Sequence, residues 1–137
     1  MNKTNTILKG FLILAITFIG FCFVGCNDDE EVGNGTIVGN TYKCHDFYID
    51  EDGWGSDNTT TITFNSSTSC EIKAWGYDYT DYDKEGYSWT ERCSYSISGN
   101  IITIKNSPLL YRREDEGFKN CGSYLERLNN GNKFFKQ

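Results

Sequence analysis

The residues best suited to chemistry lie in one stretch, "AWGYDYTDYDKEGYSW" at residues 74–89. Six Trp or Tyr side chains alternate there with four carboxylates. Aromatic faces can stack on sugar rings or hold cations, and the carboxylates beside them can accept hydrogen bonds from hydroxyl groups. Tyrosine and tryptophan are also enriched at protein interfaces, and cross-strand aromatic pairs can serve only to stabilise a hairpin. The pattern therefore leaves three interpretations open: a ligand surface, a protein interface and a stabilised hairpin.

Five aromatic residues are our candidates for ligand binding, namely Trp54, Trp75, Tyr77, Tyr79 and Trp89. The two tryptophans of the stretch distinguish the interpretations. In a ligand site, Trp75 and Trp89 are expected to be exposed and to converge on a concave surface. In a hairpin that is merely stabilised, they are expected to pack on each other.

Metal binding finds little support in the sequence. The segment "DYDKEG" at residues 81–86 resembles the start of a calcium loop, but position twelve holds Arg92 where that loop needs Glu. A looser calcium site with Asp50 and Asp52 remains an alternative. The cysteines are too widely spaced for a zinc site, and His45 is the only histidine. We predict no metal and no cofactor.

Catalysis also finds little support. The sequence contains no Gly-x-Ser-x-Gly nucleophile motif. His45 is followed by Asp46, but neighbouring residues of a strand point to opposite faces, so the two cannot form a catalytic dyad. Carboxylates for glycoside hydrolysis would have to converge from separate strands, which a sequence does not reveal. We predict no catalytic residues and a protein that is not an enzyme.

The elements that position these residues are short strands. Alternation of polar and apolar residues predicts strands at 41–48, 59–64, 70–77, 87–98, 101–105, 123–128 and 133–136, separated by turn signals. The stretch 107–120 is ambiguous, with Leu109 and Tyr111 forming a possible short strand. About eight short strands predict an all-β fold that closes as a small antiparallel barrel, with a β-sandwich as the alternative.

Four cysteines in the body of the chain suggest disulfides. An exported chain meets an oxidising compartment, and four cysteines allow three pairings. If residues 69–77 and 87–98 form a hairpin, Cys70 and Cys93 lie opposite each other on its inward face. The sequence therefore favours a Cys70–Cys93 bridge, which leaves Cys44 to pair with Cys121.

The N-terminus has the order of a secretory signal. Lys3 and Lys9 precede a run of 16 uncharged, mostly apolar residues, shorter than the roughly 20 that span a bilayer as a helix. The run ends in "FVGC" at residues 23–26, which resembles the lipobox of bacterial lipoproteins. The resemblance implies cleavage before Cys26 and acylation of Cys26, and two or more acyl chains anchor a protein stably. A permanent transmembrane helix is the alternative.

Four acids at residues 28–31 follow the cysteine. Such a run predicts a solvated tether. It also resembles the acidic export signal of surface lipoproteins in Bacteroidetes-type bacteria, which implies display on the outer face of the outer membrane. A linker facing the periplasm is the alternative. The predicted organisation is a signal peptide with its helix at 1–25, a flexible tether at 26–36 and a barrel domain at 37–137.

Charge limits the possible partners. Removal of the signal peptide leaves 11 basic and 19 acidic residues, a net charge of −8. Nucleic-acid binding needs a basic face that displaces counterions, so nucleic acid is not expected as a partner.

The body of the chain is similar to the lipocalin-like lipoproteins of Bacteroidetes-type bacteria. The similarity rests on Gly39 with Tyr42, on "TITF" at residues 61–64 and on "YSISGNIITI" at residues 95–104. True lipocalins place a Trp two residues after the glycine, whereas Tyr42 follows Gly39 by three. The resemblance implies a barrel fold and a lipid-anchored location, not an activity.

From these observations we expect a lipid-anchored, surface-exposed lipoprotein that binds a small molecule or glycan without catalysis. A structural or interaction subunit of a cell-surface protein assembly is the alternative. The expected partners are the membrane, through the N-terminal lipid, and a small ligand or glycan, with a second protein as the partner in the alternative role.

Overall fold

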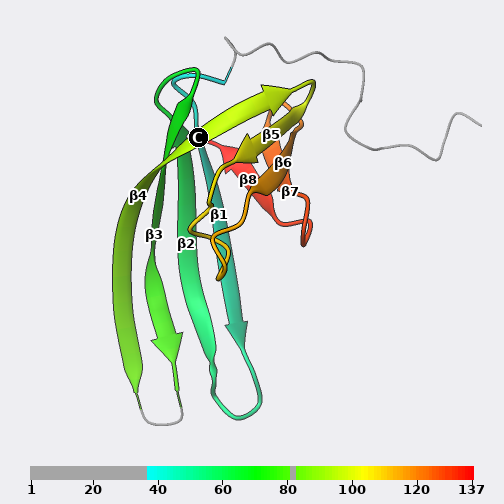
Figure 1. Cartoon of the computed structure of the whole chain (residues 1–137). Coiled ribbons are helices and arrows are strands. Elements are labelled where there is room, and N and C mark those ends of the chain that lie inside the picture. The colour runs from blue at the N-terminus through cyan, green and yellow to red at the C-terminus, as the bar shows by residue number, and fades with distance from the viewer. Residues whose placement is uncertain (1–36, 81–82) are drawn as a thin grey trace, which may run out of the picture.

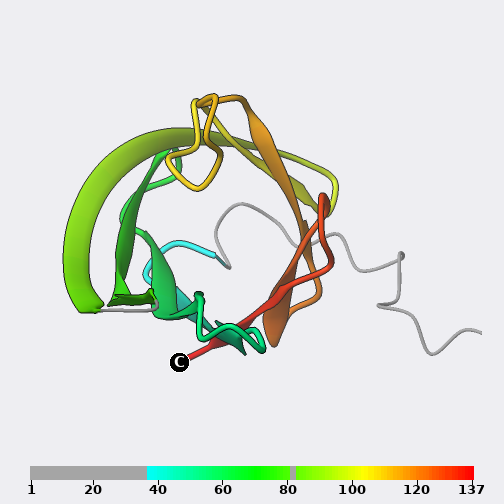
Figure 2. The ribbon, with the colours of Figure 1, turned by 90° about the horizontal axis from the view of Figure 1, so that it is seen from below.

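Eight antiparallel strands form a closed barrel in the computed structural model, which describes residues 37–80 and 83–137. The strands are β1 Thr41–Ile49, β2 Gly55–Phe64, β3 Ser69–Tyr79, β4 Lys84–Ser98, β5 Ile101–Ile104, β6 Glu116–Asn120, β7 Tyr124–Arg127 and β8 Lys133–Lys136. Each strand pairs with the next in the chain, and β8 pairs with β1 to close the ring (Figures 1 and 2). The predicted antiparallel barrel is confirmed, and the alternative sandwich is wrong.

The signal peptide, the lipobox and the acidic tether fall on residues 1–36, which lie outside the described part of the chain. Within residues 37–80 and 83–137, no helix has the length and apolar character needed to cross a membrane.

One predicted strand is misplaced. Leu109 and Tyr111 lie in a loop of turns, and the sixth strand begins later, at Glu116. Strand β6 alternates regularly between buried and half-buried residues, but two of its three buried side chains, Glu116 and Asn120, are polar. The hydrophobic pattern that identifies other strands is therefore nearly absent from this one.

The strands differ in length, and this difference shapes the molecule. Strands β1–β4 have 9 to 15 residues, whereas β5–β8 have 4 or 5. The long strands therefore extend well past the short ones, as Figure 1 shows. The loop between β5 and β6, residues 105–115, lies at the end of the short half. The barrel is thus a full ring at one end and a four-stranded sheet at the other.

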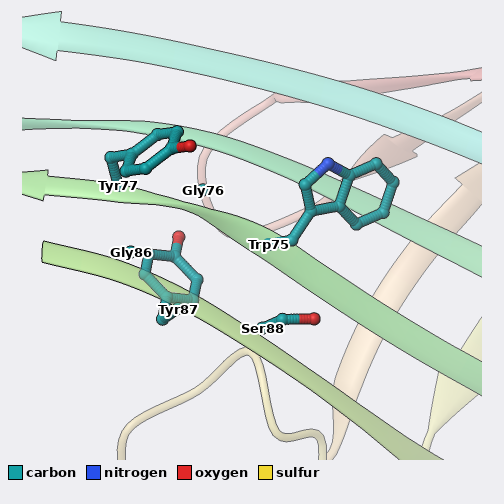
Figure 3. Close-up of a pocket in the computed structure, with 6 residues that line it drawn as sticks. All are labelled: Trp75, Gly76, Tyr77, Gly86, Tyr87 and Ser88. Atoms are coloured by element: carbon teal, nitrogen blue, oxygen red, sulfur yellow. The ribbon is translucent and has the colours of Figure 1, made fainter.

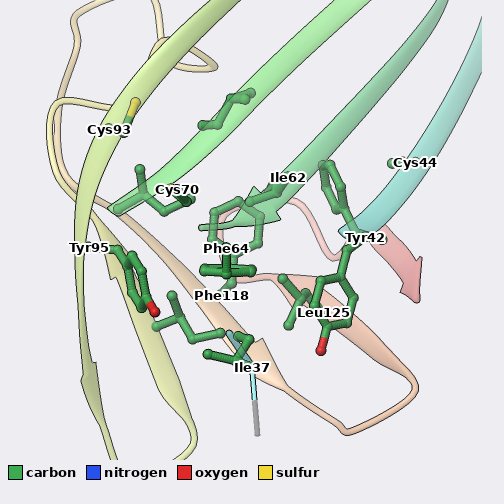
Figure 4. Close-up of a cluster of buried hydrophobic side chains, with 14 residues drawn as sticks. Ile37, Tyr42, Cys44, Ile62, Phe64, Cys70, Cys93, Tyr95, Phe118 and Leu125 are labelled. Atoms are coloured by element: carbon green, nitrogen blue, oxygen red, sulfur yellow. The ribbon is translucent and has the colours of Figure 1, made fainter. Parts of the chain in front are cut away.

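The hydrophobic core fills the end where all eight strands are present (Figure 4). Phe64 is fully buried and makes edge-to-face ring contacts with Tyr42 and Tyr95, with centroids 6.0 and 4.9 Å away. Phe118 and Phe134 form a third such pair at 5.6 Å. The remaining buried core consists mainly of isoleucines. These side chains pack the interior of the barrel at the end where the ring is complete.

The predicted register of the β3–β4 hairpin is confirmed, because Cys70 and Cys93 are direct cross-strand partners. The predicted bridge between them is not formed, and both thiols are free. The Tyr95 amide donates to the Thr68 carbonyl, and hydrogen-bonded pairs recur at every second position of the ladder. Cys70 and Cys93 therefore occupy a hydrogen-bonded pair, whose side chains stand further apart than those of a non-hydrogen-bonded pair.

The second predicted bridge, between Cys44 and Cys121, is not formed either, since Cys44 carries a free thiol. Its side chain points into the barrel from β1, where the Cys44 Sγ lies 3.8 Å from Oδ2 of Asp46. The barrel is therefore closed by strand pairing and core packing, without either predicted crosslink.

Chemical labelling tests these thiols. Burial raises the pKa of Cys70 to about 12 and that of Cys44 to about 11, and it also raises the pKa of Cys93. Because the thiolate is the reactive form, the three should resist iodoacetamide at pH 8 in the folded protein and react fully in denaturant without reductant. Peptide mass mapping identifies which cysteines carry the label. An unlabelled Cys70–Cys93 crosslinked peptide from denatured protein would contradict the free-thiol state.

Candidate functional site

Side-chain alternation sorts the charges of the long strands onto two faces. The inner face continues from the buried core, and every second residue of each strand belongs to it. All ionised residues of β1–β4 on this inner face are acidic: Asp46, Asp78, Glu85 and Glu91. The outer face carries four bases, Lys43, Lys73, Lys84 and Arg92, besides His45 and two acids, Asp57 and Glu71. The four-stranded sheet therefore has an acidic inner face and a basic outer face.

A cavity of about 260 Å³ opens on the inner face, directly below the packed core. We call it the mouth cavity. Its walls come from β1–β4, from β7 and β8, and from the 105–115 loop, and they are Asp46, Asn58, Thr60, Ala74, Tyr87, Trp89, Pro108, Leu109, Arg127 and Phe134. Ligand pockets usually measure about 300–1,000 Å³, so this cavity suits a compact ligand.

A buried ion pair anchors one wall of the mouth cavity. Arg127 of β7 pairs through Nε with the carboxylate of Glu116, which is only 2% exposed. The Ser107 hydroxyl donates to the other Glu116 oxygen at 2.6 Å, and Arg127 Nη2 donates to the Leu109 carbonyl at 3.1 Å. The network satisfies each buried polar group, as burial requires. It therefore ties the 105–115 loop to the barrel and balances the charge of Arg127.

The acidic side of the mouth cavity is formed by Asp46. Its Oδ2 accepts a hydrogen bond from the Asn132 amide at 3.1 Å, and no lysine or arginine pairs with it among the described residues. Burial, and then the charge of Asp46, raises the pKa of Cys44 to about 11, which keeps that thiol neutral. The cavity therefore presents one uncompensated carboxylate.

Aromatic side chains form the wall opposite. Trp89 packs partly against the core, and Tyr87 lies further out on the same face of β4. Burial raises the pKa of Tyr87, and the charges of Asp78 and Asp57 raise it further. The phenol is therefore neutral at physiological pH and can donate a hydrogen bond.

The outer face of the same hairpin carries a second aromatic group. Trp75, Tyr77 and Tyr79 follow one another at every second position of β3, and they line up on that face. A shallow hollow of about 370 Å³ lies over this part of the hairpin (Figure 3). Lys84 Nζ lies 3.9 Å from the Tyr77 ring centroid and Lys73 Nζ 5.3 Å from that of Trp75. We call these five residues the outer platform.

The structure separates the predicted ligand-binding residues. Trp75 pairs with Ser88 across the hairpin and Trp89 pairs with Ala74, so the two tryptophans lie on opposite faces of the sheet. They neither converge on one concave surface nor pack on each other. Trp54 lies apart from both, half exposed in the β1–β2 connection. Sequence reasoning missed Arg127, Glu116 and Asp46, because isolated charged residues carry no motif.

The residues of the alternative calcium site have other roles in the structure. Asp50 Oδ1 accepts hydrogen bonds from the amides of Asp52 and Trp54, an Asx arrangement that closes the β1–β2 turn. Among residues 37–80 and 83–137, no group of three or more His, Cys, Asp or Glu side chains is arranged to hold a metal. Asp81, the first residue of the calcium-like segment, lies outside the described residues.

His45 is bound on the outer face, away from Asp46. Its Nε2 lies 2.8 Å from Oδ1 of Asp57, and both side chains are well exposed. In this exposed geometry the pair orients the Asp57 carboxylate next to the outer platform.

Comparisons of the chain with protein-family models, with curated proteins and with solved structures find no significant match. The class of protein is therefore defined by the fold alone: a small closed antiparallel β-barrel with a polar cavity at one end.

Proposed function

We propose that this protein is a lipid-anchored lipoprotein of the bacterial outer membrane, exposed at the cell surface, that binds a small molecule in its mouth cavity without catalysis. The observation that carries the binding function is the cavity itself. Its walls combine the rings of Tyr87, Trp89 and Phe134 with the polar side chains of Asp46, Asn58, Thr60 and Arg127, so a small ligand can both pack on rings and form hydrogen bonds there.

The charges of the mouth cavity favour a compact ligand that carries an amine. Arg127 is neutralised by Glu116, whereas Asp46 has no basic partner among the described residues. Asp78 and Glu85 continue the same acidic face towards the ends of the long strands. Aromatic rings such as Trp89 add a favourable site for a cation.

A thermal-shift experiment on the full-length protein in detergent micelles tests this function. The probes are glucosamine, choline and spermidine, with N-acetylglucosamine as the uncharged match of glucosamine and a fatty acid as an anionic control. A ligand at 100 times its Kd stabilises by about 2.7 kcal/mol, a rise in Tm of roughly 10 °C for a domain of this size. We expect an amine to stabilise and its neutral match to fail.

Matched variants locate the ligand. Asp46→Asn and Trp89→Phe should remove the shift, whereas Trp54→Phe, on a tryptophan outside the cavity, should leave it intact. A shift that survives both cavity variants would place the ligand elsewhere, and no shift with any amine would reject the amine-binding site.

The lipid anchor has its own test. We expect radiolabelled palmitate to be incorporated into the full-length protein, and Cys26→Ala to abolish the label and release the protein from membranes. Protease treatment of intact cells should degrade a surface-exposed protein and spare a periplasmic one. Palmitate labelling that persists in the Cys26→Ala variant would contradict the lipobox assignment.

One observation favours the alternative role as an interaction subunit. Large apolar side chains are exposed at the end of the β1–β2 hairpin: Phe47, Tyr48 and Ile49 are 62, 63 and 41% exposed, and Trp54 is 49% exposed. Exposed aromatic groups of this kind are typical of protein interfaces. If none of the amines stabilises the protein, the next experiment is a search for a protein partner that binds this hairpin.

A further inference from the structure

We propose that the outer platform, formed by Lys73, Trp75, Tyr77, Tyr79 and Lys84, binds an anionic polysaccharide. Its three rings lie on the face of the β3–β4 hairpin opposite the Trp89 wall of the mouth cavity, and Tyr87 is the residue that lines both the hollow beside these rings and the mouth cavity. Its ligand is a chain of sugar rings that carry carboxylates or sulfates.

The spacing of the three rings suits a polymer. Trp75, Tyr77 and Tyr79 stand at successive outward positions of one strand, so their Cα atoms are roughly 6.5–7 Å apart in a straight row. Trp75 and Tyr77 line a shallow hollow together with Tyr87 and Ser88 (Figure 3). A compact molecule would contact one ring, whereas an extended chain of sugars can contact all three.

The aromatic faces lie close to the sheet surface. A Cβ placed on Gly86 would lie 3.3 Å from Cε1 of Tyr77, its cross-strand neighbour, so the Tyr77 ring packs directly over the glycine backbone. A ring held in this way is pre-oriented for its ligand. A broad aromatic surface fixed on a strand is the arrangement that stacks on the apolar face of a sugar.

The local charge selects an anionic chain. The protein has a net charge of −6, yet the outer face of β1–β4 carries four Lys or Arg residues against Asp57 and Glu71. Lys84 Nζ lies 3.9 Å from the Tyr77 ring and 5.2 Å from the Tyr79 ring, and Lys73 lies by Trp75. Each ring of the platform therefore has an ammonium group beside it.

These lysines have no carboxylate partner in the described residues and rest against the rings instead. A carboxylate or sulfate on the ligand gives each ammonium group a stronger, charge-assisted partner. When Lys84 turns towards that anion, the Tyr77 ring is uncovered for a sugar. The two contacts thus become available together.

The neighbouring polar groups favour a sugar over a nucleic acid. Asp57 is the cross-strand partner of Tyr77, and Thr59 and Ser88 flank Trp75 on either side. The Asp57 carboxylate, held by His45, can accept hydrogen bonds from sugar hydroxyls, which the backbone of single-stranded DNA lacks. Hydroxyl groups around a ring serve the same purpose.

Biolayer interferometry with the full-length protein in detergent micelles tests the proposal. The probes are polygalacturonate and chondroitin sulfate, each beside its carboxyl-reduced or desulfated form. We expect the anionic polymers to bind, their neutral forms to bind at least fivefold more weakly, and added salt to weaken the binding further. Lys84→Gln and Lys73→Gln should each raise the Kd roughly two- to fivefold, and Tyr77→Ala should raise it at least as much.

Control variants come from a different exposed region. Tyr111→Ala removes a fully exposed aromatic ring, and Arg112→Gln an exposed charge, in the 105–115 loop, and both should leave the Kd unchanged. Asp46→Asn, which should abolish amine binding in the mouth cavity, should also leave it unchanged, so failure of one site is distinguishable from failure of the other. Each variant is checked for a native Tm.

Three outcomes would overturn the proposal. The first is no binding of either anionic polymer by the wild-type protein. The second is equal binding of polyglutamate or oligo(dT), which would mean that charge alone, or a nucleic acid, is recognised. The third is self-association that Lys73→Gln and Lys84→Gln abolish in analytical ultracentrifugation while glycans have no effect, which would make the basic face a contact between copies of this chain.

Discussion

Replacement of Arg127 by methionine is expected to lower the free energy of unfolding by about 3–5 kcal/mol, since removal of one partner leaves a buried charge uncompensated. The remaining partner, Glu116, is 2% exposed and would keep only the Ser107 hydroxyl and a long contact from Asn129 at 3.5 Å. The change also removes the hydrogen bond to the Leu109 carbonyl. Urea denaturation of the full-length protein, followed by circular dichroism, measures the loss.

The same chain offers a matched control. Arg113 of the 105–115 loop pairs with Glu91 of β4, but both side chains are substantially exposed. Exposed ion pairs contribute about 0–1 kcal/mol, so Arg113→Met should cost no more than that. Equal losses for Arg113→Met and Arg127→Met would show that Glu116 is not the source of the effect. The double variant Arg127→Met, Glu116→Gln should recover part of the loss, because the uncompensated charge is gone.

The consequence for binding follows from the position of the network. Arg127 and Leu109 both line the mouth cavity, and their hydrogen bond is the contact by which β7 holds the loop. A weakened anchor lets the loop move away from that wall. Arg127→Met should therefore weaken any ligand of the mouth cavity even at temperatures where the barrel remains folded, and it should not affect the outer platform.

Most of the fold prediction came from the alternation of polar and apolar residues along the chain. Because side chains of a strand alternate with a period of two, the pattern around Ile72 and Ile102 identified strands, their inward faces and their approximate ends. Pairing Cys70 with Cys93 fixed the hairpin register correctly, even though no disulfide joins them. The register depends on which face is apolar, and a shift by one residue would expose that whole face.

The same register already separated the two tryptophans. Partners across the β3–β4 hairpin share a face of the sheet. Trp75 pairs with Ser88, and Trp89 is the next residue along β4, so its side chain points to the other face. They must therefore lie on opposite faces, one towards the mouth cavity and one on the outer platform. The candidate site could have been divided into two from the sequence, if the alternation had been followed through to residue 89.

Other features had no sequence signal. The 105–115 loop and the start of β6 are held by Glu116, whose burial depends on an arginine 11 residues away in another strand. A prediction based on hydrophobicity places polar residues on the solvent-exposed face, even where they point into the barrel. The walls of the mouth cavity include such residues, so the cavity could not be predicted from the sequence, whereas the apolar core could.

Replacement of Phe64 by alanine is the second large effect that we expect, about 3–5 kcal/mol of lost stability. Phe64 has no exposed surface, and its ring makes edge-to-face contacts with Tyr42 and Tyr95, so its removal leaves a cavity in the packed end of the barrel. Phe135→Ala, in β8, deletes the same ring from a side chain that is 54% exposed and should cost far less. Urea denaturation compares the two.

The location of Phe64 also separates the core from the binding faces. It lies in the packed end, outside the mouth cavity and the outer platform. The Phe64→Ala protein, assayed where it is still folded, should therefore keep wild-type Kd values for both proposed ligands while its Tm falls. A large loss of binding at unchanged secondary structure would mean that the packed core sets the shape of the long strands, and that the two ends of the barrel are mechanically coupled.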